Sequence, residues 1–88
     1  MLVLADPAQE AARDRERLRR LFGLTAAEAE FALEIAKGHG LAAAATRRGI
    51  AASTARTHLS SIFDKTGTRR QAELVRLLLQ LDIAPPRL

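Results

Sequence analysis

One segment, residues 45–75 of this 88-residue chain, restricts the fold more than any other; it reads ATRRGIAASTARTHLSSIFDKTGTRRQAELV. It overlaps an alanine-dense stretch, 41–48, whose small side chains allow another helix to approach closely. Gly49 is expected to end that stretch with a positive φ, and Ile50 to fill the corner before a second helix over about 52–66. The segment therefore predicts two short helices joined by a tight turn.

The second helix, 52–66, is predicted to have one buried and one exposed face. Apolar side chains recur on one side at helical spacing. They are Ala55, Leu59, Ile62 and Phe63. Arg56, Ser60 and Asp64 follow one another at i, i+4 and i+8 on the opposite side. This outer face is free to meet a partner.

The N-terminal region is predicted to begin with a leader helix. Asp6 supplies a capping oxygen and Pro7 suits the first helical position, so a helix is expected over about 8–22. Its middle is polar except for Leu18, and we interpret residues 1–23 as a leader or linker.

Two more helices follow from capping signals on either side of the turn. Thr25 with Glu28 predicts a capping box that opens a helix to about residue 37. Thr68 with Gln71 predicts a second box that opens a last helix to about residue 81. Period-two alternation is absent beyond a few residues, so the expected fold class is all-α, with a domain over 24–82 and a tail over 83–88.

Composition excludes several kinds of chemistry. With no cysteine, the chain has no disulfide and no thiol nucleophile, which favours a reducing intracellular setting. Of its two histidines, His58 is expected to pack and His39 to lie in an exposed loop, so no metal site is expected. The sequence also lacks a phosphate-binding glycine loop and a carboxylate pair, so neither enzyme activity nor a cofactor is expected. No apolar run reaches about 18 residues, which favours a cytoplasmic protein without membrane contact.

The net charge of +4 is unevenly distributed. Residues 1–38 have a net charge of −1 and residues 39–88 a net charge of +5. The positive excess is concentrated in residues 47–70, around the predicted turn and second helix. A concentrated basic surface suits a polyanion such as double-stranded DNA. A basic surface that is only solvated is the alternative interpretation.

A set of landmark residues occurs in a characteristic order through residues 49–75. They are Gly49, Ile50, Thr54, Arg56, His58, Leu59, Ile62, Phe63, Lys65, Gly67, Ala72, Glu73, Leu74 and Val75. In this order they resemble the LuxR-type (GerE-type) helix-turn-helix of bacterial transcription regulators, over about residues 24–81. The resemblance implies a four-helix DNA-binding domain whose helix 52–66 enters the major groove.

The resemblance also has departures. Ala51 stands where the family usually has a Ser or Thr helix cap, and Arg48 stands where it favours Leu. Many relatives have Lys or Arg where Ser60 stands, so this chain is expected to read fewer bases directly.

Arg56 is the first candidate for base readout, because a guanidinium reaches two acceptors on guanine. The resemblance places Thr57 and Ser60 beside it at base edges, although hydroxyls contact phosphates equally well. Ser53 and Thr54 start the helix, where oxygens and free amides suit a phosphate; helix capping alone is the alternative.

Five further cations are predicted to contact phosphates without reading sequence. They are Arg47, Arg48, Lys65, Arg69 and Arg70. Contacts of this kind predict a steep loss of affinity with salt, and solvation without a partner is the alternative for each.

The last helix has more leucine than one apolar face needs, with only Arg76 and Gln80 as a polar stripe over its second half. We expect a two-fold helix pair through four leucines, with deep packing inside the monomer as the alternative. The four are Leu74, Leu77, Leu78 and Leu81. In LuxR-type proteins the matching helix commonly forms the dimer contact, which implies an inverted-repeat site.

The resulting hypothesis is a sequence-specific DNA-binding transcription regulator that acts as a homodimer, with RNA polymerase as a further possible partner. One alternative is a sigma-factor-like region that recognises promoters through a similar helix-turn-helix. Another is a protein-interaction module that binds a regulator through its leucine-rich last helix.

Overall fold

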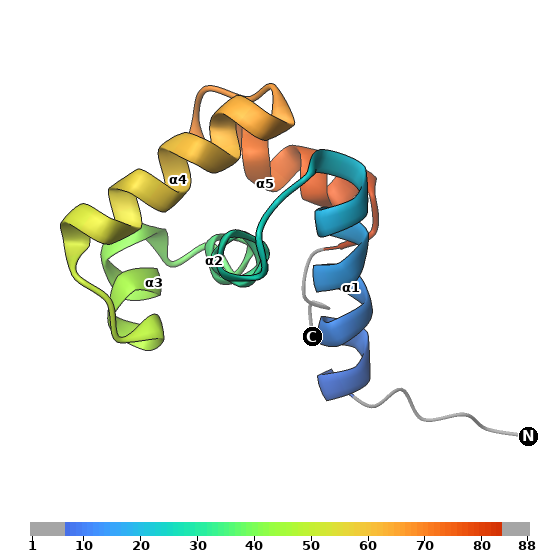
Figure 1. Ribbon diagram of the computed structural model, residues 1–88, viewed down its shortest axis with the longest axis horizontal. Helices are drawn as coiled ribbons and strands as arrows, with labels where there is room; N and C mark the ends of the chain where they lie inside the picture. The colour runs from blue at the N-terminus through green and yellow to red at the C-terminus, as the bar shows by residue number, and fades with distance from the viewer. Residues whose placement is uncertain (1–6, 84–88) are drawn as a thin grey trace, which may run out of the picture.

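The computed structural model describes residues 7–83, and over this range the protein is all-helical (Figure 1). The helices are α1 (Pro7–Phe22), α2 (Ala26–Ala36), α3 (Gly40–Arg48), α4 (Ala52–Thr66) and α5 (Gln71–Gln80). The expected cap at Asp6 lies outside the described residues. None of the described helices combines the length and apolar character needed to span a membrane.

Helix α2 lies at the centre and packs against α1, α3, α4 and α5 (Figure 1). Its apolar residues Phe31, Ala32 and Ile35 are at most 1% exposed. Ala44 of α3 and Ala55 of α4 are fully buried, so small side chains bring the two helices close together. Ala55, Leu59 and Ile62 face the core as predicted, and Phe63 is half-buried against it.

Helix α1 belongs to this core. Leu18 has no exposed surface, and Phe22 packs partly buried against the same cluster. At the other end of the chain, Ile83 is 1% exposed and also belongs to the core. The buried Leu18 and Ile83 therefore attach α1 and the residue after Asp82 to the same core, while the division of the chain at residues 23 and 82 stays a prediction.

The predicted turn between α3 and α4 is confirmed. Gly49 has a φ of +65°, and its N–H donates to the Thr46 carbonyl at 3.1 Å. The N–H of Ile50 donates to the Ala45 carbonyl at 3.0 Å, and its side chain packs half-buried against the core. This is the Schellman arrangement, in which a left-handed residue closes the helix and the next side chain covers its end.

The start of α2 is also confirmed, whereas the predicted start of α5 was wrong. Thr25 and Glu28 form a capping box with hydrogen bonds of 3.1 Å and 2.9 Å. The Thr68 hydroxyl instead shares a 2.9 Å hydrogen bond with Thr66, and α5 begins at Gln71. Glu73 accepts hydrogen bonds from the backbone N–H groups of residues 69 and 70, and so caps α5 in place of the expected box.

We predict that Leu18→Ala lowers the free energy of unfolding by about 2–5 kcal/mol, because it removes a fully buried side chain from the shared core. Leu21→Ala is the matched control on the same helix, since Leu21 is 55% exposed, and should change stability little. Urea denaturation followed by circular dichroism measures both. Equal, small effects would show that α1 does not contribute to the core.

Candidate nucleic-acid interface

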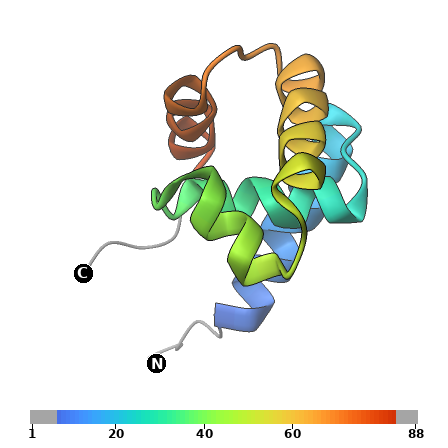
Figure 2. The same cartoon turned by 90° about the vertical axis from the view of Figure 1, so that its left-hand side faces the viewer.

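The outer face of α4 is exposed and lies at one side of the molecule, next to α3 (Figure 2). The predicted contact residues on this helix, Ser53, Thr54, Arg56, Thr57 and Ser60, are all exposed. An open, shallow groove runs along this face. It is lined by Ser53, Arg56, Thr57, Ser60, Ser61 and Asp64. The structure thus brings one cation, one anion and several hydroxyls into a single strip.

The first turn of α4 starts without a side-chain cap. Ala51 is the N-cap residue, in an extended conformation with φ −67° and ψ 152°, and it has no side-chain oxygen to offer. The first hydrogen bond within the helix runs from the Ala55 N–H to the Ala51 carbonyl at 2.9 Å. The amides of residues 52–54 therefore lack acceptors within the helix and point toward the surface. Such amides can donate to a phosphate.

The polar groups in the groove differ in what they can still bind. Within residues 7–83, no carboxylate lies within ion-pair distance of the Arg56 guanidinium. The Thr57 hydroxyl donates to the Ser53 carbonyl at 3.1 Å, so its proton is used and its lone pairs remain. Ser60 has its hydroxyl exposed. Arg56 is therefore the donor best placed to reach outward.

Three of the predicted phosphate-contacting cations instead pair with carboxylates of α2. Lys65 Nζ lies 2.8 Å from Glu28 Oε1. Arg47 lies 3.6 Å from Glu34, and Arg48 pairs with Glu30. These pairs join α2 to α3 or α4, so spacing along one helix did not reveal them. They reduce the positive charge that the three cations present to a partner.

Glu28 is the most buried charged residue of the described chain, at 6% exposure. Burial alone would raise the pKa of its carboxyl group. Hydrogen bonds from the Lys65 ammonium, the Ser61 hydroxyl and the Thr25 backbone, with the charge of Lys65, outweigh burial and lower the pKa to about 2. The carboxylate joins the start of α2 to the end of α4, and so helps to hold α4 in place.

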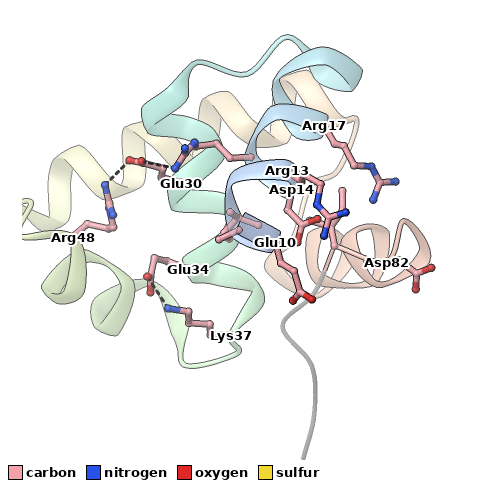
Figure 3. A pocket seen from close by; sticks show the side chains of 13 residues that line it. Glu10, Arg13, Asp14, Arg17, Glu30, Glu34, Lys37, Arg48 and Asp82 are labelled. Carbon is pink, nitrogen blue, oxygen red and sulfur yellow. Dashed lines mark hydrogen bonds and ion pairs between the residues drawn. The ribbon is translucent and has the colours of Figure 1, made fainter. Parts of the chain in front are cut away.

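Glu30 joins three helices, because its carboxylate also lies 3.3 Å from Arg15 of α1 while it holds Arg48 of α3. Both arginines line a cleft between α1 and α2 that sequence reasoning missed (Figure 3). Arg13, Arg17 and Asp82 lie on the far side of this opening (Figure 3). Five basic and five acidic side chains line the cleft, so it has no net charge to attract a polyanion.

Arg69 and Arg70 are exposed in the loop between α4 and α5. No carboxylate of the described residues forms an ion pair with either side chain. Glu73 approaches their backbone, and the hydrogen bonds donated by the two amides lower the pKa of its carboxyl group. Both guanidinium groups remain available at the C-terminal end of α4.

The predicted dimer contact on α5 needs correction. Leu74 and Leu78 have no exposed surface and lie in the monomer core, so they cannot meet a second chain in this fold. Leu77 and Leu81 are half-buried. Leu79, which was not predicted, is the most exposed leucine of α5, at 43%. Packing against α2 explains much of the leucine excess in this helix.

His58 is half-buried and its ring centroid lies 6.0 Å from that of Phe31, in agreement with the packing role predicted for it. His39 is exposed, as expected. Among residues 7–83, no group of three His, Cys, Asp or Glu side chains is arranged to hold a metal ion.

Comparisons of the chain with protein-family models, with curated proteins and with solved structures found no match.

We predict that Glu28→Gln lowers the free energy of unfolding at pH 7 by about 1–3 kcal/mol, because a charge-assisted hydrogen-bond network is lost. The folded-state pKa is depressed, so the contribution of Glu28 is complete above about pH 4.5 and is lost as the pH falls toward about 2. Urea denaturation between pH 7 and pH 2.5 should therefore show a smaller acid loss for Glu28→Gln than for the wild type.

Glu16→Gln is the control, since Glu16 is exposed on α1 and pairs only loosely with Arg19, at 3.5 Å. It should retain the acid response of the wild type. Equal acid responses in all three proteins would contradict the role assigned to Glu28.

Proposed function

We propose that the protein is a sequence-specific DNA-binding transcription regulator that places α4 in the major groove of double-stranded DNA. The observation that carries the proposal is the outer face of α4, where Arg56 has no ion-pair partner among residues 7–83 and lies in a groove lined by hydroxyl groups. The LuxR-type resemblance implies a scaffold helix, a first turn helix, a recognition helix and a last helix, and we assign these roles to α2, α3, α4 and α5 in that order.

The dimensions and chemistry of α4 support this role. The major groove is about 12 Å wide and admits one α-helix. Arg56 can donate to two acceptors of a guanine, and Ser60 can donate or accept beside it. Thr57 offers acceptor lone pairs and a methyl group, because its proton is bound to the Ser53 carbonyl. The expected contribution of α4 is thus one strong base contact and a few weaker ones.

Phosphate contacts are expected on either side of this helix. The uncapped amides of residues 52–54, with the hydroxyls of Ser53 and Thr54, can hold a phosphate at the start of α4. Arg69 and Arg70 can hold another near its end. Arg47, Arg48 and Lys65 are partly neutralised by α2, so each should release fewer counterions than a free cation.

The distinct roles of these arginines give the main test. Arg56→Gln should weaken binding to a selected duplex by about 5- to 150-fold, because it removes a bidentate base contact. Arg69→Gln should weaken binding to every duplex similarly and reduce the salt slope by about one. Fluorescence anisotropy with duplexes selected from a random pool, at several salt concentrations, measures both effects.

Arg13→Gln on α1 removes the same charge away from α4 and is the matched control, with affinity expected to stay near that of the wild type. Equal affinities in all the variants would exclude the proposed orientation of α4. Failure of the folded wild type to bind any duplex at low ionic strength would exclude DNA binding.

We further propose that two chains pair through the outer side of α5 on an inverted repeat. Leu79 supports this idea, because a leucine at 43% exposure on a helix next to the DNA-facing unit leaves apolar surface for a partner to cover. Half-buried Leu77 and Leu81 can extend the contact, without the core residues Leu74 and Leu78.

Leu79→Glu should reduce the number of chains bound to an inverted-repeat duplex from two to one, as measured by sedimentation of the complex. Leu21→Glu is the matched control, since Leu21 is 55% exposed on α1, and it should leave the stoichiometry unchanged. Two chains bound by the Leu79→Glu protein would contradict pairing through α5.

A further inference from the structure

Asp64 stands in the groove of α4 at the opposite end from the first turn. Its side chain is exposed, and it lines the same strip as Arg56 and Ser60. Within residues 7–83, no cation forms an ion pair with its carboxylate. The ammonium of the adjacent Lys65 pairs with Glu28 instead. The face that would enter the DNA thus has an unneutralised anion.

An ionised carboxylate accepts hydrogen bonds and cannot donate them. In the major groove, guanine and thymine present only acceptors and a methyl group, whereas cytosine presents the N4 amino group and adenine the N6 amino group. A carboxylate therefore fits only where one of these amino groups points at it. Against guanine O6, thymine O4 or a phosphate it would meet another negative atom, which is unfavourable.

The spacing along α4 fixes where such a base would lie. Asp64 follows Arg56 by eight residues, which is about 12 Å along a helix that rises about 1.5 Å per residue. Base pairs are stacked about 3.4 Å apart. A helix lying along the groove therefore places Asp64 about three or four base pairs from the guanine that Arg56 contacts.

We propose that Asp64 is a second specificity determinant, which accepts a hydrogen bond from a cytosine or adenine amino group about three or four base pairs from the Arg56 contact. This inference rests on the proposed DNA-binding function. Arg56 and Asp64 then form a donor and acceptor pair at the two ends of one readout strip: Arg56 selects a guanine, and Asp64 rejects any base without an amino group.

The test is selection of bound fragments from a random pool of duplex DNA, performed with the wild type, Arg56→Gln and Asp64→Asn. Asparagine keeps the size of the side chain but both donates and accepts, so it should tolerate the bases that aspartate rejects. We expect Asp64→Asn to lose the preference at one position, about three or four base pairs from the position relaxed in Arg56→Gln. Its discrimination there should fall by about tenfold.

Asp14→Asn on α1 makes the same chemical change away from α4, and should select the same sequences as the wild type. Unfolding curves confirm that each variant is folded, which is expected for Asp64→Asn because the side chain is exposed and forms no ion pair within residues 7–83.

The outcomes separate the two proposals. If Asp64→Asn selects the same base at every position as the wild type, the inference is overturned while DNA binding stands. A uniform rise in affinity for all duplexes would also overturn it, because it would mean that Asp64 only repels phosphates. If the wild type enriches no sequence, the proposed function fails first, and the inference fails with it.

Discussion

The arrangement of the described helices depends on α2, which contributes both apolar contacts and ion pairs to its neighbours. Phe31, Ala32 and Ile35 bury its apolar side against the surrounding helices. Its carboxylates Glu28 and Glu30 pair with cations on α1, α3 and α4. Burial of apolar surface is the dominant favourable term in folding, but it is non-directional, so it determines the relative orientation of two helices only weakly. The ion pairs restrict this orientation further, since each requires a particular carboxylate of α2 to lie close to a particular cation of a neighbouring helix.

This arrangement divides the cations of residues 47–70 into two groups. Those that pair with α2, such as Arg48 on α3 and Lys65 on α4, help to fix the positions of these two helices. Those that cannot reach it, Arg56 on the outer face and Arg69 in the following loop, stay free for a partner. A count of basic residues in the sequence does not separate these groups, and so overestimates the positive charge left for a partner. Within residues 47–70, the cations without an ion pair to a described carboxylate are Arg56, Arg69 and Arg70.

Local signals explain which features could be predicted from the sequence. The turn at Gly49 and the capping box of Thr25 and Glu28 involve residues within a few positions of each other, so spacing alone predicts them. The start of α5 was mispredicted because Glu73 competes successfully for the free amides that Thr68 was expected to cap. Pairing of Lys65 with Glu28 joins residues 37 positions apart, and no local pattern contains that information.

If α4 enters DNA as proposed, its charge balance has a consequence for specificity. Attraction to the phosphate backbone acts on every sequence alike, so cations raise the affinity for wrong sites as much as for right ones. On the outer face of α4, the charge of Arg56 is balanced by that of Asp64, and the general attraction is left to residues in the flanking loop such as Arg69. A helix of this composition gains little from entering an arbitrary groove. It gains most where base edges match its donor and its acceptor, so the difference between right and wrong sites grows even though the total charge is modest.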